Sequence, residues 1–369
     1  FQQIPSITAV ELNPQLVNLV KKDYGDFSGH LFTQKNVDLH IGEGRGFVTE
    51  SDKQYDLIQV SLLDAFSASS AGLYALNESY IYTVEALQTY LKHIKPDGYL
   101  AISRWIKLPP RDSLKLFATA IEALRTSGSE TPETQLILIR SWQTSTLVIK
   151  NNPFNLEEIN QLKAFCKERA FDLAWYSGMQ AGEANQYNHL REPYFYQAAV
   201  AMLGNDKTAF MDRYKFDLRP STDDRPYFFH FFKWDVLPEI LKLRGQGGMP
   251  LLEWGYLVSI ATFLQAIIVS IILILLPLWT LKRRSKNNIG NVSSLKVFTY
   301  FFAIGLAFLF IEIAFIQKFV LFLHHPLYAA ATVITGFLIF AGMGSLWSQK
   351  ISNKHQYRKN MKTAVIGIA

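Results

Sequence analysis

Three acidic residues stand at the ends of predicted strands in the first part of this chain of 369 residues. Glu11 lies at the end of the predicted strand in ITAVEL, just before Leu12, Glu43 lies in GEGRG after the strand VDLHI, and Asp64 follows YDLIQVSLL. In an open α/β sheet, ligands bind in the crevice outside the carboxyl ends of the strands. A carboxylate there can accept both hydroxyl groups of a ribose. It can also hold an adenine amino group beside a backbone amide such as that of Gly44, or bind an amine and act as a base.

Each of these carboxylates also has a structural interpretation that the sequence leaves open. Glu11 precedes Asn13-Pro14 and can favour the N-terminus of the helix that begins there. Glu43 can lie in a solvated turn, and Asp64 can be an N-cap or a loop residue. The small, flexible stretch AFSASSAG after Asp64 can be a lid over the crevice.

The elements that must position these residues alternate between strand and helix over the first 105 residues. Helices are predicted after Asn13-Pro14, where Asn is the N-cap and Pro the first helical position, and from Asn77 to Ile94. Strands separated by helices imply right-handed crossovers and a largely parallel sheet. The third strand is predicted to be buried, because its apolar residues form a run. The four predicted strands are residues 7–12, 37–41, 55–62 and 99–105.

The pattern changes after residue 105. A hairpin of residues 136–141 and 146–150 is predicted to form an antiparallel pair at one edge of the sheet. Residues 221–234, STDDRPYFFHFFKW, are dense in aromatic side chains. These rings favour either core packing or a position near a membrane surface. Further helices are predicted at residues 112–126, 156–170 and 194–203.

From Tyr256 the sequence becomes a series of membrane spans. Residues 256–280 hold no charge, and at ~1.5 Å per residue such a helix crosses a hydrocarbon layer of ~30 Å. Further spans are predicted at residues 297–323 and 327–347, and AVIGIA at the end reads as the start of a fourth. The predicted organisation is an α/β domain at 1–150, a helical and aromatic extension at 151–255 and a transmembrane region at 256–369.

Charge and cysteine content exclude some classes of function. The net charge is +6, and Lys and Arg concentrate in the spacers after the first and third spans, with no basic stripe over the soluble half. This pattern fits membrane topology better than nucleic-acid binding, so we expect a lipid bilayer as partner and no nucleic acid. Cys166 is the single cysteine, and His324-His325-Pro326 reads as an interfacial turn. We expect no metal site.

Several stretches resemble the spermidine synthases in their order along the chain. They are VELNP with Glu11, the strand-end GEG, YDLIQVSLLD, the helix ESYIYTVEAL and the turn and strand KPDGYLAISRW. The resemblance covers about residues 5–150. It implies a Rossmann-like, class I methyltransferase-like fold that binds S-adenosyl ligands, decarboxylated S-adenosylmethionine in particular. The chain also resembles membrane-fused spermidine synthase-like proteins in TDDRPYFF and in FIEIAFIQKFVLFLHHP.

The resemblance implies roles for individual residues. Glu11 matches the family's ribose-binding acid, and Glu43, next to Gly44, matches an Asp that contacts adenine. Asp64 matches the second Asp of the family's D-x-x-D strand end, which helps to hold the amine acceptor, and we assign it the catalytic role as well. Tyr80 lies in the predicted helix start that helps to wall the acceptor pocket.

Two departures from the family pattern bear on activity. The first Asp of D-x-x-D, the family's proton acceptor, falls on Ser61, and loss of a positioned base typically costs about 10²–10⁴-fold in rate. The family's first strand and glycine-rich loop would lie before Phe1. We therefore expect an N-terminally truncated sequence in which nucleotide binding is weakened.

Glu312 is a candidate intramembrane polar residue in the middle of the second predicted span. A charged group at that depth costs about 2.5–3.5 kcal/mol on insertion scales. Such a residue either marks a polar pathway through a helix bundle or is a neutral, protonated acid bonded to Gln317 or to another helix.

The charge pattern and the family resemblance predict opposite sides of the membrane for the α/β domain. The basic spacers favour a domain on the outer side by the positive-inside rule, whereas S-adenosyl ligands are cytosolic. We follow the resemblance and expect an integral, multi-pass protein of the plasma (inner) membrane with a cytosolic domain. An outward-facing domain without S-adenosyl activity is the alternative.

Two functions of different classes follow. The first is a membrane-anchored, aminopropyltransferase-like enzyme of polyamine biosynthesis that transfers a group from decarboxylated S-adenosylmethionine to a small-molecule amine. A methyltransferase that uses S-adenosylmethionine is a close variant of it. The second is a multi-pass transport or scaffold protein with a catalytically inactive nucleotide-fold domain, which Ser61 and Glu312 favour.

Overall fold

The computed structural model describes residues 4–63, 75–238, 254–284, 294–323 and 326–349. Asp64, the predicted lid after it, His324, His325 and the predicted start of a fourth span lie outside these residues. The chain divides into two compact units, which are described separately below. One consists of residues 1–47 and 286–369, and the other of residues 48–285.

The first unit begins with two parallel strands. β1 (Ile7–Glu11) pairs in parallel with β2 (Val37–Ile41), in register from end to end. The helix that follows β1, α1 (Pro14–Asn18), begins as predicted, because the Asn13 side chain accepts a hydrogen bond from Gln15 N at 2.9 Å. An N-cap of this kind satisfies N–H groups that have no partner within the helix. Two residues separate the end of β1 from the start of α1.

The second unit is built on a mixed sheet with the strand order β3-β4-β6-β5-β7. β3 and β4 are parallel, and the other neighbouring strands are antiparallel. The parallel pairing predicted for the strands of the first 105 residues is confirmed for β1 with β2 and for β3 with β4. The predicted hairpin β5–β6 then joins β4 in the antiparallel sense, which makes the sheet of the second unit mixed. The hairpin was predicted at one edge of the sheet, and this is wrong, because β7 pairs with β5 and forms that edge. The strands are β3 (Tyr55–Val60), β4 (Ile94–Trp105), β5 (Leu136–Arg140), β6 (Thr144–Lys150) and β7 (Asp172–Trp175).

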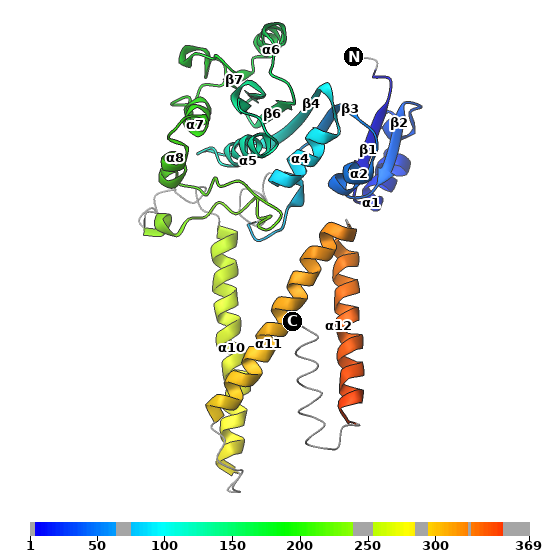
Figure 1. The fold of residues 1–369 in the computed structure, drawn as a ribbon, viewed down its shortest axis with the longest axis vertical. Helices are drawn as coiled ribbons and strands as arrows, with labels where there is room; N and C mark the ends of the chain where they lie inside the picture. The colour runs from blue at the N-terminus through cyan, green and yellow to red at the C-terminus, as the bar shows by residue number, and fades with distance from the viewer. Residues whose placement is uncertain (1–3, 64–74, 239–253, 285–293, 324–325, 350–369) are drawn as a thin grey trace. The chain divides into compact units, whose positions relative to one another are not determined.

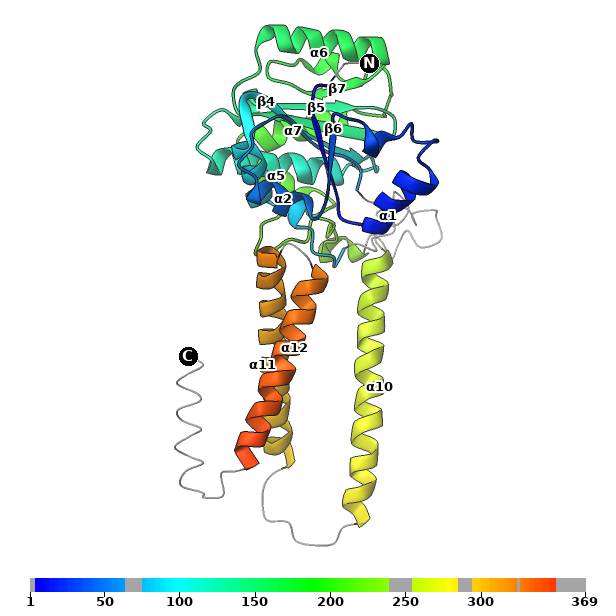
Figure 2. The same cartoon turned by 90° about the vertical axis from the view of Figure 1, so that its right-hand side faces the viewer.

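Helices cover both faces of this sheet, as Figures 1 and 2 show. α5 (Asp112–Thr126) packs on one face beside α4 (Val84–Lys92), and most of its residues are buried. α6 (Leu156–Arg169) lies on the other face and carries the buried Cys166. α7 (Tyr194–Leu203) and α8 (Lys207–Arg213) follow.

Three local predictions are wrong. Asn77 does not cap a long helix, because Tyr80–Tyr82 form a separate 3₁₀ turn and α4 begins after Thr83, which is its N-cap. The stretch GEGRG is not a turn throughout, since α2 (Gly44–Glu50) begins inside it. β3 is not a buried strand, because Leu57 is 50% exposed.

Three helices of the described chain are long and apolar enough to cross a membrane. They contain the three predicted spans and are α10 (Trp254–Arg284), α11 (Ser294–Leu323) and α12 (Pro326–Gln349). Within the first unit α11 packs against α12, where the ring of Phe337 lies 5.2 Å from that of Phe308. Packing contacts of this kind contribute to the association of apolar helices.

Candidate functional site

Glu11 and Glu43 belong to neighbouring strand ends of the first unit. Glu11 is the last residue of β1 and lies opposite Ile41, the last residue of β2. The backbone N–H of Gly42 donates to the carbonyl of Glu11 at 3.1 Å, so the chain leaves β2 alongside Glu11. Glu43 is the next residue. The two acids therefore come from adjacent ends of a parallel pair, where open α/β sheets bind their ligands.

The Glu11 carboxylate is half-buried and has one oxygen engaged. Its Oε1 accepts a hydrogen bond from Asn13 N at 2.9 Å, and Oε2 accepts none from the part of the chain that the structure describes. An ionised carboxylate has about four lone-pair sites, so acceptor capacity remains for hydroxyl groups. The bond to Asn13 also favours the alternative interpretation, a role in starting α1.

Glu43 caps the helix that follows it. Its Oε2 accepts a hydrogen bond from Gly46 N at 2.6 Å, and its Oε1 accepts one from Arg45 N at 3.1 Å. Because α2 begins at Gly44, Glu43 is in the N-cap position rather than in a solvated turn. A Cβ added at Gly44 would meet no atom within 4 Å, so the described atoms leave space beside its backbone.

Tyr80 belongs to a cluster of phenols and carboxylates in the second unit. Its hydroxyl donates to Glu78 Oε2 at 3.1 Å, and the Tyr227 hydroxyl donates to Glu78 Oε1 at 3.5 Å. Burial and the charge of Glu78 raise the pKa of Tyr80 above its usual value, so this phenol remains a hydrogen-bond donor. Tyr80 was predicted from the sequence as a site residue, whereas Glu78 and Tyr227 were not.

The stretch TDDRPYFF lies against the turn that carries Tyr80. Ser79 N donates to the carbonyl of Pro226 at 2.7 Å, and the Thr83 hydroxyl donates to Asp223 Oδ1 at 2.8 Å. The stretch therefore brings Asp223 to this turn from more than a hundred residues away in sequence. The resemblance to membrane-fused spermidine synthase-like proteins includes TDDRPYFF. The spacing of residues along the sequence does not predict that this stretch contacts residues 78–83.

The aromatic residues of the same segment pack in the core. Phe228 is fully buried, and its ring lies 4.7 Å from that of Tyr82. The Arg104 guanidinium lies over the Tyr82 ring at 5.0 Å, a cation–π contact. Phe232, also buried, contacts the Tyr256 ring at the start of α10 at 5.3 Å. Core packing, one of the two interpretations of these rings, therefore holds for Phe228 and Phe232.

Asp112 is the centre of a buried charge cluster at the carboxyl end of β4. Its Oδ2 lies 3.2 Å from Arg104 Nη2 and 3.3 Å from Lys107 Nζ, and its Oδ1 lies 3.9 Å from Arg111 Nε. Burial alone would raise the pKa of Asp112, but the three cations outweigh it and hold that pKa below its usual value. This cluster was not predicted from the sequence, because the spacing of charged residues near a strand end does not show that they are buried together.

The structure gives fewer contacts for the other predicted site residues, Ser61, Asp64 and Glu312. Ser61 directly follows β3, and Asp64 lies outside the described residues. Glu312 is half-buried on α11 and has no hydrogen bond or ion pair with any described residue. No group of three or more His, Cys, Asp and Glu in the described ranges could hold a metal ion.

The fold and these residues define a Rossmann-like α/β domain with acids at its strand ends, followed by three long apolar helices. Residues 1–107 match the family model of the spermine/spermidine synthase domain. Polyamine aminopropyltransferase 2 of Hyperthermus butylicus is 26% identical over 95 residues, which are 26% of this chain and 29% of that protein. The polyamine aminopropyltransferase of Sulfolobus acidocaldarius is 25% identical over 126 residues, which are 34% and 38%. The match thus spans about a third of these relatives.

Solved structures give weaker similarities. Spermidine synthase from Thermotoga maritima aligns with a TM-score of 0.31 and 12% identity, over 57% of this chain and 61% of that one. Human methyltransferase-like protein 13, in complex with SAH, aligns with a TM-score of 0.31 and 17% identity, over 44% and 70%. Similarities at this level carry no argument about activity.

Proposed function

We propose that this chain is a membrane-anchored, aminopropyltransferase-like protein that transfers a group from an S-adenosyl donor to a small amine. The match of residues 1–107 to the spermine/spermidine synthase domain carries this proposal, together with the position of Glu11 at the end of β1. The apolar helices α10, α11 and α12 are the proposed anchor. The donor is decarboxylated S-adenosylmethionine, or S-adenosylmethionine if the protein is a methyltransferase.

Glu11 is proposed to hold the ribose of the donor. The half-buried carboxylate has acceptor capacity at Oε2, and two hydroxyl groups on adjacent carbons suit a carboxylate that accepts two hydrogen bonds. Glu43 keeps its capping bonds and retains lone pairs for an adenine amino group, and the space beside Gly44 allows a ring to approach the backbone. The residues present therefore fit a nucleoside.

Asp64 and Tyr80 are proposed to hold the amine acceptor. In the transfer, the amine nitrogen forms a bond to the carbon beside the sulfonium, the carbon–sulfur bond breaks, and its electron pair returns to sulfur. One proton must leave the amine before the attack. Ser61 has no carboxylate to accept that proton, so Asp64 is proposed to accept it. Glu78, bonded to the hydroxyl of Tyr80, adds negative charge that favours a cationic amine.

Calorimetry on the full-length protein in detergent tests the proposal. Decarboxylated S-adenosylmethionine and S-adenosylmethionine are titrated separately into the wild type, Glu11→Gln and Glu168→Gln, the last being a matched control on the exposed surface of α6. The wild type should bind one donor. Glu11→Gln should weaken binding about tenfold or more, because one charged acceptor is lost, and Glu168→Gln should not.

Each outcome of this titration has a consequence. No heat with either donor would overturn the enzyme proposal and leave the transport or scaffold function, which Ser61 favours. Equal affinity of the wild type and Glu11→Gln would show that Glu11 serves α1 and not the ribose. A donor-binding protein that forms no product with any amine would contradict the transfer itself.

A further inference from the structure

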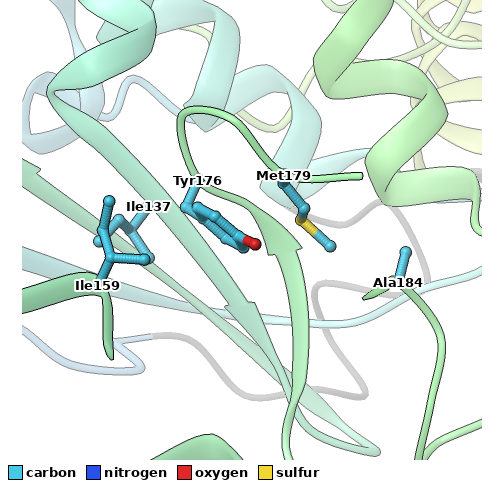
Figure 3. Close-up of a cluster of buried hydrophobic side chains, with 5 residues drawn as sticks. All are labelled: Ile137, Ile159, Tyr176, Met179 and Ala184. Atoms are coloured by element: carbon cyan, nitrogen blue, oxygen red, sulfur yellow. The ribbon is translucent and has the colours of Figure 1, made fainter. Parts of the chain in front are cut away.

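A hollow of about 270 Å³ lies between α6 and the sheet of the second unit. Its walls come from strands β4, β5 and β6, from the residues before α6, and from α6 itself. It adjoins the buried cluster of Ile137, Ile159, Tyr176, Met179 and Ala184, which Figure 3 shows. The hollow is open to the surface of the second unit. Its volume is much larger than the water-sized voids that occur inside closely packed proteins. The lining residues are Tyr99, Ile137, Val148, Phe154, Glu158, Gln161, Leu162 and Phe165.

The walls of the hollow are mostly aromatic and aliphatic. The Tyr99 and Phe154 rings are stacked, with centroids 6.2 Å apart and planes 22° from parallel. Phe165, on α6, is 46% exposed; its ring meets that of Phe171 edge-on at 5.9 Å and lies 5.6 Å from the Arg169 guanidinium, and the rest of its surface is open to solvent. Leu162 and Val148 pack against the neighbouring cluster and close the floor. Ring faces and edges at such a site favour a flat aromatic ligand over a flexible chain.

The polar groups of the hollow are neutralised within the wall. Glu158 Oε1 accepts hydrogen bonds from the Tyr99 hydroxyl at 2.6 Å and from Lys150 Nζ at 2.7 Å. Glu158 Oε2 accepts one from Asn155 N at 2.8 Å, as part of the cap of α6. Burial and Glu158 raise the pKa of Tyr99 to about 12, so the phenol remains protonated. A charged ligand would therefore find no unpaired opposite charge here.

Gln161, an exposed residue of α6, supplies an uncharged side-chain acceptor at the rim of the hollow. Its Nε2 donates to Glu157 Oε1 at 3.2 Å, and its Oε1 accepts no hydrogen bond from a described residue. An amide carbonyl beside aromatic walls suits a ligand with a single N–H or O–H donor.

We propose that this hollow binds an uncharged aromatic molecule of one or two fused rings that bears one hydrogen-bond donor, such as an indole or a phenol. A cavity of about 150 Å³ is known to hold one benzene ring, so 270 Å³ suits a slightly larger ring system. Tyr99 lies six residues along β4 from Trp105, about 20 Å at the rise of a strand. The site is thus separate from the carboxyl end of β4 and does not depend on the proposed function.

Ligand-observed NMR and calorimetry with indole test the proposal on the full-length protein in detergent. Leu162→Trp fills the hollow, and Leu156→Trp places the same side chain on the first turn of α6, where Leu156 is 79% exposed. Gln161→Ala removes the acceptor. We expect the wild type and Leu156→Trp to bind indole with affinities within about twofold. Leu162→Trp should lose at least about tenfold, and Gln161→Ala a few-fold.

Other results would overturn the assignment. The absence of indole binding to the wild type, or equal binding to Leu162→Trp, would mean that the hollow is not a ligand site. Decanol bound as tightly as indole would contradict the aromatic class. Phe165→Ala keeps the proposal testable if Leu162→Trp does not fold, because a half-exposed ring can be removed with little cost to folding and indole binding should still weaken.

Discussion

Asp112→Asn should destabilise the second unit strongly. The substitution keeps the size of the side chain and removes its charge from among Arg104, Lys107 and Arg111, all buried. Removal of one member of a buried charge group typically costs about 3–5 kcal/mol, because the opposite charges remain desolvated. For a unit of this size, each kcal/mol lowers the thermal midpoint by about 2–4 °C, so the expected decrease is about 6–20 °C.

Intrinsic tryptophan fluorescence at a fixed heating rate measures this midpoint for the detergent-solubilised protein. Asp56→Asn is the matched control, because Asp56 is 85% exposed and its ion pair with Lys95 at 2.9 Å is worth at most about 1 kcal/mol. Adding Lys107→Met to Asp112→Asn should recover several degrees, since one of the cations that Asp112 balances is then gone.

The pH dependence of the same variant follows from the lowered pKa of Asp112. A lowered pKa in the folded state stabilises the protein fully above the unfolded pKa of about 4, and this contribution is lost as pH falls through the folded pKa. The gap between the wild type and Asp112→Asn should therefore shrink below pH ~4. A midpoint for Asp112→Asn within a few degrees of that for Asp56→Asn at pH 7 would refute the reasoning.

Three further variants test other contacts. Glu43→Ala should lower the stability of α2 by about 0.5–2 kcal/mol, seen as faster hydrogen exchange of the Arg45 and Gly46 amides, and unchanged exchange would contradict the cap. Asp217→Asn should cost about 1–2 kcal/mol at pH 7 in thermal melts. Arg219 holds the pKa of Asp217 at about 2 against the effect of burial, so the difference should fade between pH ~4 and about 2. Thr83→Ala should destabilise the start of α4 by about 1–2 kcal/mol by thermal melts, while Thr83→Ser, which keeps the hydroxyl, should retain most of the stability.

Local signals in the sequence predicted the helices well where a cap or a clear period was present. α5 and α7 begin and end at the predicted residues, and α1 begins at the predicted cap, because Asn followed by Pro satisfies the first N–H groups locally. Asn77 does not cap α4, because the N-cap of that helix is Thr83, six residues later. The Thr83 hydroxyl also donates to Asp223, which comes from a distant segment. β7 was missed because four residues are too few to show a period.

The candidate site was predictable only in part, for a similar reason. Strand order places Glu11 and Glu43 at adjacent ends, and strand order follows from short-range patterns. The partners of Tyr80 depend on contacts between residues near 80 and residues near 225, which no periodicity encodes. The burial of Arg104 and Asp112 is likewise a property of packing and not of spacing.

The single cysteine gives this chain a practical advantage. Cys166 is 2% exposed on α6, and burial raises the pKa of its thiol to about 11, so at pH 7 only about one thiol in ten thousand is the reactive thiolate. Maleimide reagents should therefore leave the native chain almost unmodified. New cysteines introduced at the ends of the apolar helices can then be labelled from either side of a sealed vesicle without first removing the natural one.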